Sequence, residues 1–204
     1  MKLKKIASLV LAGVMAVSML AGCSNKGTEN NGTNDQEQTT TASSLSSELR
    51  KALSNDAMRK VTAISNSKLD AALEDAVEKY FTNANYQSDR QADVTALVYA
   101  DAPIYKDVVK TMDAITGFSG LNGDDTVAIK MYSVDSSVSD AYAVEKIADK
   151  IEAGIAALAK EGNKEDYKYD ISASVVTRTR EVFGTTVGVK YIAVAVSQNV
   201  TAID

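Results

Sequence analysis

The sequence predicts an α+β or α/β domain, built as a two-layer sandwich. A mixed sheet of about four strands is expected to carry its helices mainly on one face. Three observations lead to this fold class. Helical and strand-like periodicities alternate after residue 44, and the last forty residues form an expected β-hairpin. The apolar fraction of 45% suffices for a core, and 204 residues fit one domain of ordinary size.

The first elements of this domain are predicted to be helices. One helix is favoured by the apolar residues Leu45, Leu49, Ala52 and Leu53, could extend to Val61, and can be interrupted by Asn55-Asp56. A clearer helix is expected after Ser67, because this serine can cap it and Asp70 places an acid in its first turn. Its apolar face comprises Leu69, Leu73, Ala76, Val77, Tyr80 and Phe81.

A strand and a helix are expected next, and the pair is then repeated. Residues 93–100 are rich in β-branched and aromatic side chains, and Asp101 with Pro103 can open the following helix. Residues 126–134 alternate as a strand does. The last helix is predicted from one apolar stripe, Val144, Ile147, Ala148, Ile151, Ile155 and Leu158.

The end of that last helix and the hairpin complete the expected fold. Gly162 is placed as the residue just after the helix, and residues 161–166 as a loop. The hairpin joins residues 169–182 to residues 186–200 through a turn at Gly184. Its second strand is apolar on both faces, which is typical of a central strand covered on both sides. Strand–helix–strand units are expected to be right-handed crossovers if their strands are parallel.

The N-terminus has the pattern of an export signal. Three lysines precede an apolar run over residues 6–20, which is shorter than the about 20 apolar residues of a membrane-spanning helix. The run ends in Leu-Ala-Gly-Cys at residues 20–23. This motif resembles the lipobox of bacterial lipoprotein signal peptides, and the resemblance covers residues 1–23 only. It implies that residues 1–22 are removed and that Cys23 carries a lipid anchor in the cell membrane, on the extracytoplasmic side.

Residues 23–44 are expected to form a lipidated, disordered tether. Asn, Thr, Gly and Gln dominate residues 24–44, without helical or strand-like periodicity. A flexible coil of this length spans roughly 25 Å. It would hold one globular domain, residues 45–204, away from the lipid surface.

Charge and composition exclude several function classes. Removing the three signal lysines from 22 basic residues leaves 19 against 27 acidic ones, a net charge of −8. This acidity argues against nucleic acid as a partner. The absence of histidine excludes Ser-His-Asp, Cys-His and His-ligated metal chemistry. We therefore predict no cofactor and no metal site. The expected partners are the membrane, through Cys23, and an envelope protein or a cell-wall polymer.

Two weak candidate sites stand out among the remaining polar residues. Asp124 and Asp125 follow a glycine before a strand, where carboxylates could act in hydrolysis. Asn-Gly-Asp-Asp is also ordinary loop chemistry, which an exposed turn explains without any catalytic role. Arg178, Arg180 and Lys190 lie on the expected hairpin, and Arg178 would face Lys190 if the turn centres on Gly184. Such a basic cluster could bind a phosphate-bearing polymer or a lipid headgroup, or simply keep the solvent face polar.

Aromatic residues could form sugar-stacking platforms or cover the rim of the core. They fall into two groups: Tyr80, Phe81 and Tyr86, and Tyr167 and Tyr169. Taken together, the sequence favours a non-catalytic binding or interaction module of the cell envelope. The alternative is a small extracytoplasmic hydrolase that uses carboxylates.

Overall fold

The computed structural model describes residues 43–82, 97–100, 102–121, 126–162, 165–182 and 184–202. Its helices are α2 (Ser44–Ala52), α3 (Asn55–Met58), α4 (Ser67–Thr82), α5 (Ala102–Met112), α6 (Asp140–Ala156) and the 3₁₀ helix η2 (Phe118–Gly120). Its strands are β1 (Val61–Ala63), β2 (Val98–Tyr99), β3 (Ile115–Thr116), β4 (Val127–Asp135), β5 (Glu161–Gly162), β6 (Glu165–Val182) and β7 (Thr185–Ala202). Within these ranges no helix has the length and apolarity needed to cross a bilayer.

The strands form one mixed sheet in the order β1-β6-β7-β4-β2, with β3 paired to β4 and β5 paired to β6. This seven-stranded sheet is larger than the four strands predicted. β7 occupies the middle, as its two apolar faces indicate. The C-terminal hairpin is confirmed, and it is the longest element of the sheet, with 18 residues in each strand. β2 pairs antiparallel with β4, so the condition of parallel strands, on which a right-handed crossover between them depended, is not met.

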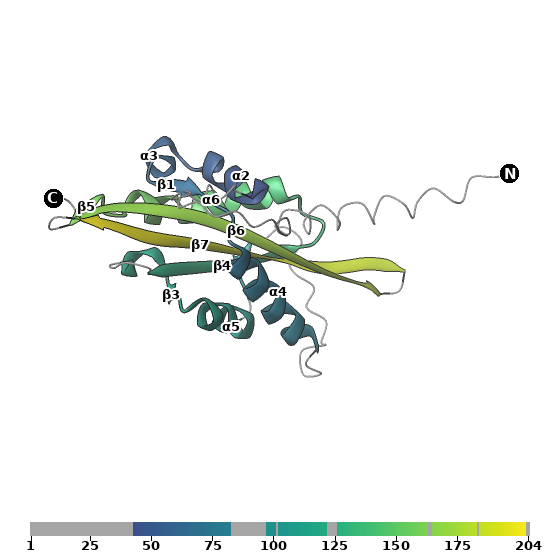
Figure 1. The fold of residues 1–204 in the computed structure, drawn as a ribbon. Helices are drawn as coiled ribbons and strands as arrows, with labels where there is room; N and C mark the ends of the chain where they lie inside the picture. The colour runs from purple at the N-terminus through teal and green to yellow at the C-terminus, as the bar shows by residue number, and fades with distance from the viewer. Residues whose placement is uncertain are drawn as a thin grey trace, which may run out of the picture. The chain divides into compact units, whose positions relative to one another are not determined.

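Helices cover both faces of the sheet, so the prediction of two layers with helices mainly on one face is wrong. On one face α2, α3 and α6 pack on alternate residues of β4, β6 and β7, with Ile147 and Ile192 at the centre. On the other face α4 and α5 pack on the intervening residues, with Leu73 and Ala193 at the centre. Figure 1 shows the two helical layers above and below the hairpin. The hairpin therefore contributes to two hydrophobic cores at once.

The hairpin turn fixes a register that differs from the expected one by a single residue. Val182 pairs with Thr185, so the two strands do not pair symmetrically about Gly184. Gly184 has φ +77°, the left-handed conformation that glycine adopts without steric cost. Because side chains alternate along a strand, a shift of one residue moves each side chain to the opposite face.

Two helix ends also differ from the predictions. The backbone N–H of Leu69 donates to Asn66 Oδ1 at 3.0 Å, so Asn66 and not Ser67 caps α4. Helix α6 ends at Ala156, and Gly162 lies in β5 and not at the helix terminus. The end of α6 is stabilised differently, because Lys60 Nζ donates to the carbonyl oxygens of Ala156 and Leu158. A lysine at these carbonyls also complements the negative end of the helix dipole.

The outer edge of β6 is covered by elements from the start of the domain. β1 pairs with it in parallel, from Val61 opposite Tyr169 to Ala63 opposite Ile171. Beyond β1, the backbone N–H of Ala173 donates to Ser46 Oγ of α2 at 3.0 Å. Ser46 is fully buried there, and its hydroxyl oxygen satisfies the Ala173 N–H, which β1 is too short to reach.

Candidate functional site

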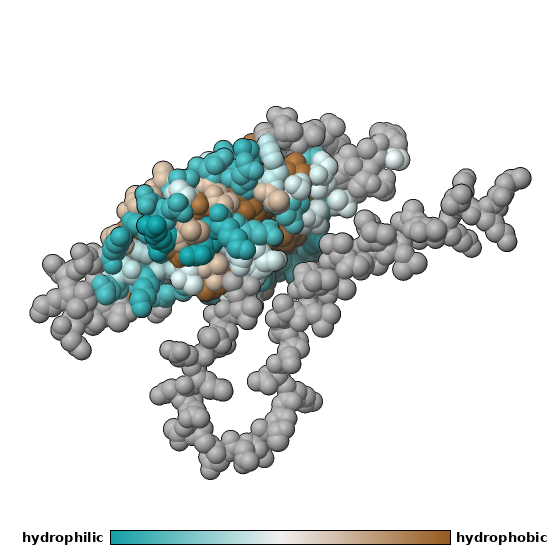
Figure 2. Space-filling model, turned by 90° about the horizontal axis from the view of Figure 1, so that it is seen from above, coloured by the Kyte–Doolittle hydropathy of each residue, from teal (hydrophilic) through white to brown (hydrophobic). Residues whose placement is uncertain are grey.

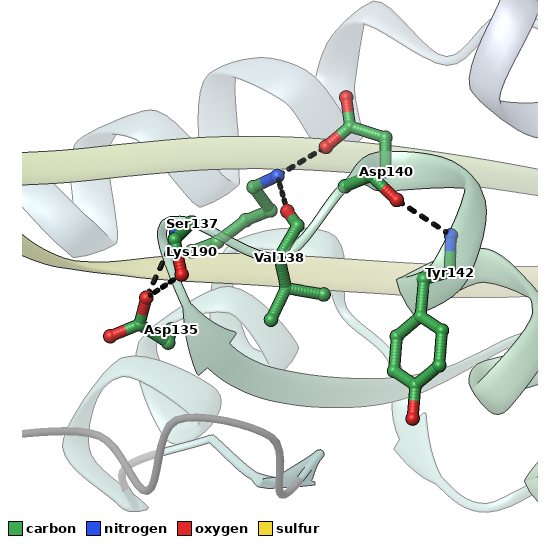
Figure 3. Close-up of polar contacts among 7 residues, drawn as sticks. Asp135, Ser137, Val138, Asp140, Tyr142 and Lys190 are labelled. Atoms are coloured by element: carbon green, nitrogen blue, oxygen red, sulfur yellow. Dashed lines mark hydrogen bonds and ion pairs between the residues drawn. The ribbon is translucent and has the colours of Figure 1, made fainter.

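Lys190, predicted to lie on the hairpin, is a residue of β7 whose side chain stabilises the loop between β4 and α6. Its side chain is 9% exposed, and Nζ donates to the carbonyl of Val138 at 2.6 Å and to Asp140 Oδ1 at 2.5 Å. Figure 3 shows the ammonium group directed into this loop. Ser139 caps α6 here by accepting from the N–H of Tyr142, while Asp135 accepts from Ser137. Lys190 therefore ties the start of α6 to the centre of the sheet.

Arg178 lies on the other face of the hairpin. It pairs with Val189, whereas Lys190 pairs with Thr177, so the expected opposition of Arg178 and Lys190 is wrong. The Arg178 guanidinium forms an ion pair with Glu78 of α4. For Arg180 the structure gives the backbone pairing with Val187. Arg178 and Lys190 thus do not share the face that a common basic cluster requires, and each has an acidic partner of its own.

Replacing Lys190 by methionine is expected to lower the free energy of unfolding by about 1–2 kcal/mol. The apolar stem is preserved, but the Val138 carbonyl loses its donor and Asp140 loses its cation. The cost stays moderate because the Asp140 side chain is 51% exposed and can be hydrated. Urea denaturation followed by circular dichroism measures the change. Lys168→Met, at an exposed position of β6, is the control and should change stability little. Equal stability of the two variants would contradict the structural role of Lys190.

None of the described aspartate and glutamate side chains whose exposure the structure gives is buried. The buried polar side chains are Ser46, Ser133, Ser172, Ser174, Lys190 and Gln198, which include no aspartate or glutamate. Nor do the described residues contain a group of three or more Asp, Glu, Cys or His side chains that could hold a metal ion. Asp124 and Asp125 lie outside the described residues, as does Cys23. A carboxylate-dependent hydrolase therefore stays a prediction without support from this geometry.

The aromatic residues singled out in the sequence mostly pack on the cores. The Tyr80 ring meets that of Phe81 edge-on at 5.4 Å, and Phe81 meets the buried Tyr191 at 6.3 Å. Both pack against the core beneath α4, so they cover its rim rather than form a free platform. Tyr169 is 3% exposed, and burial raises the pKa of its hydroxyl. Tyr86 lies outside the described residues.

One tyrosine forms an exposed aromatic surface at the sheet edge. Tyr99 of β2 is 72% exposed and stacks on the buried Tyr132 with ring centroids 5.6 Å apart. Burial, and then the neighbouring Tyr99 and Tyr105, raise the pKa of the Tyr132 hydroxyl. A phenol with a raised pKa stays protonated at neutral pH, so Tyr132 is not suited to act as a nucleophile.

A hollow of about 270 Å³ lies where three distant segments meet beside β6. The turn after α3 and strand β1 contribute Arg59, Lys60 and Thr62 to its lining. Ala159 and Lys160 follow α6, and residues 167–169 belong to β6. Its eight lining residues are Arg59, Lys60, Thr62, Ala159, Lys160, Tyr167, Lys168 and Tyr169. We call this site the basic hollow, because four of these residues are cationic and none is acidic.

The basic hollow could not be identified from its sequence pattern. Arg59-Lys60 and Lys160 stand in short charged segments about a hundred positions apart. They come together because β1 pairs with β6, and β1 is too short to show a strand periodicity. The sequence did single out Tyr167 and Tyr169, either as sugar platforms or as cover for the rim of the core. Tyr169 is in fact part of the core, and Tyr167 is a partly buried residue of the wall.

A second hollow, of about 360 Å³, lies along α5 on the opposite face of the sheet. It combines Lys106 and Lys110 with the carboxylate of Asp113 and with Tyr105, Val109, Ala114 and Thr116. The Tyr105 hydroxyl donates to the carbonyl of Ile129 at 2.9 Å and is therefore engaged in packing α5 on β4. This hollow is a weaker ligand site than the basic hollow, because its charges are of both signs and the Tyr105 hydroxyl is already hydrogen-bonded.

Comparisons with protein-family models, with curated proteins and with solved structures find no match to this chain. The function is therefore argued from the residues and the site geometry.

Proposed function

We propose that this protein is a bacterial lipoprotein, anchored in the cell membrane through Cys23, whose extracytoplasmic domain is a non-catalytic binding module. The lipobox-like sequence at residues 20–23 supports the anchor, and the polar residues 24–42, which precede the Ser43 cap of α2, support a tether. The domain would then be held at the outer side of the membrane with freedom to reorient.

The observation that carries the binding role is the composition of the basic hollow. Four cations line it, and no carboxylate is present in its wall to act as an acid, a base or a metal ligand. Glycoside hydrolysis by a pair of carboxylates needs two that converge on one site, and neither of the two hollows described has two carboxylates in its lining. An exposed cationic concavity is better suited to holding an anion than to transforming it.

The anchor is tested by mass spectrometry of the membrane fraction after the chain is expressed in a bacterium. We expect the mature N-terminal residue to be Cys23, with a diacylglyceryl group on its sulfur. Two acyl chains hold a protein stably, whereas one chain of myristoyl length gives only marginal binding. The matched control is the Cys23→Ser variant, which should carry no lipid and should be absent from the lipidated fraction. An unmodified Cys23 in the mature chain would refute the lipoprotein proposal.

A further inference from the structure

The basic hollow concentrates positive charge on an acidic protein. The full chain carries 27 acidic against 22 basic residues, yet this site is lined by one arginine and three lysines without an acidic neighbour in its wall. Figure 2 shows the face that carries α2, α3 and α6, where hydrophilic residues cover most of the surface and brown apolar areas are small. This face therefore offers charge and hydrogen bonding to a ligand rather than a broad apolar surface.

The four cations of the basic hollow have different roles. Lys60 is committed to the end of α6, where its ammonium donates to two backbone carbonyls. Arg59, Lys160 and Lys168 are exposed, and none of the ion pairs found among the described residues involves them. Three cations are thus available to a ligand, while Lys60 adds charge and fixes the wall.

The chemistry of these groups favours a phosphate ligand. A guanidinium presents a planar fork of donors to phosphate oxygens, and an ammonium group binds them as a point charge. The exposed Thr62 hydroxyl and the Tyr167 wall add hydrogen-bonding and ring surface at the same place. These groups suit a ligand in which phosphates alternate with small hydroxyl-bearing units.

We propose that the basic hollow binds a polyanion of polyol phosphodiesters, with Arg59, Lys160 and Lys168 contacting successive phosphates. This inference rests on the proposed role of the domain as a binding module. Three exposed contacts are each weak, so affinity depends on several phosphates in one chain, as in multivalent binding.

A flexible polymer fits the charge distribution better than an anionic membrane surface does. Once residues 1–22 are removed the chain carries a net charge of −8, which repels an extended anionic plane. The cations lie in a concavity between β1, β6 and the end of α6, which a chain can enter and a planar surface contacts only at its rim.

The test measures binding of dye-labelled poly(glycerol phosphate) to the full chain in neutral-detergent micelles, by fluorescence anisotropy. We expect saturable binding whose affinity falls with salt, with a log–log slope of about −2 for three neutralised phosphates on a flexible strand. Between 50 and 200 mM salt this slope corresponds to a loss of roughly 16-fold. The double variant Lys160→Gln/Lys168→Gln should weaken binding at least about fivefold and reduce the slope by one unit or more.

The matched control is Lys106→Gln/Lys110→Gln, which removes the same charge from α5 on the opposite face of the sheet. It should leave the affinity and the slope unchanged. Equal losses in both double variants would show diffuse attraction and overturn the proposal, as would the absence of polymer binding. Circular dichroism melting curves of both variants check that the fold is retained.

A second arm separates a polymer from a membrane headgroup. Two competitors are titrated separately against the bound, labelled polymer: micelles doped with phosphatidylglycerol, and unlabelled polymer. The two are compared at equal phosphate concentration. The proposal requires the unlabelled polymer to displace the label at the lower concentration, and the opposite order overturns it. Neither arm depends on the state of Cys23. Loss of polymer binding with a lipidated Cys23 therefore refutes the ligand alone, and an unlipidated Cys23 refutes the anchor alone.

Discussion

Replacing Leu73 by alanine is expected to lower the free energy of unfolding by about 3–4 kcal/mol. Leu73 lies on α4, is fully buried and contributes to the core on the α4–α5 face of the sheet. Its truncation removes buried apolar surface and leaves a cavity that neighbouring secondary structure cannot fill by collapse. Urea denaturation of the full chain, followed by circular dichroism, measures the loss.

Two further variants test whether helices cover both faces of the sheet. Glu74→Ala changes the next residue, which is exposed, and should alter stability by no more than about 0.5 kcal/mol. Ile147→Ala removes a fully buried residue of α6 on the opposite face and should cost as much as Leu73→Ala. A loss below about 1 kcal/mol for Leu73→Ala, beside a full loss for Ile147→Ala, would contradict helical cover on both faces.

Replacing Gly188 by alanine is expected to destabilise the protein by about 2–3 kcal/mol. A Cβ atom at this position would overlap the carbonyl oxygen of Arg178 and lie 2.7 Å from Thr179 Cγ2 and 2.8 Å from Ser136 Oγ. The close approach is built into the fold, because the N–H of Ser136 donates to the Gly188 carbonyl at 3.1 Å. A side chain would have to move this loop, and with it the start of α6.

The control for Gly188 is the turn residue of the same hairpin. Gly184 has φ +77°, but no atom lies within 4 Å of a Cβ built there. Gly184→Ala should therefore cost about 1–2 kcal/mol, from backbone conformation alone. Thermal and urea unfolding of both variants are compared under identical conditions. If Gly184→Ala proved the more damaging change, the steric explanation for Gly188 would fail.

The periodic parts of the fold could be predicted from the sequence. The stripe from Val144 to Leu158 is buried as expected, and the two strands of the hairpin are found where their apolar pattern placed them. Long amphipathic elements repeat the same signal over several turns or pleats, so single exceptions do not hide it. The central position of β7 was also correct, since a strand apolar on both faces needs cover on both sides.

The predictions that were wrong concern long-range geometry, which local sequence patterns do not determine. The same argument that placed β7 at the centre implies helices on both faces, but periodicity does not say which helix covers which face. The pairing of Val182 with Thr185 shifts the register by one residue, and this alone separates Arg178 from Lys190. Strands of two or three residues, such as β1 and β5, are too short to show alternation.

The candidate site was harder to predict than the fold, because it depends on pairing between distant segments. Lys190 was flagged for its charge, yet it binds the loop before α6 from within the protein. The basic hollow draws its cations from residues 59–60, 160 and 168, which no local pattern connects. Charge alone therefore could not distinguish a lysine that serves the fold from one that is available to a ligand.

The dependence of the first elements on the last strand pair has a consequence for the order of folding. β1 pairs with β6, and the Ala173 N–H donates to Ser46, a residue 127 positions earlier in the chain. A polypeptide emerging from its N-terminus can pack α2 on α6 and α4 on α5, but it cannot complete the burial of α2, β1 and α4 until β6 and β7 are present. Such non-local contacts predict slow folding, and a chain truncated before β7 would leave apolar surface open on both sides, as a substrate for proteases and chaperones.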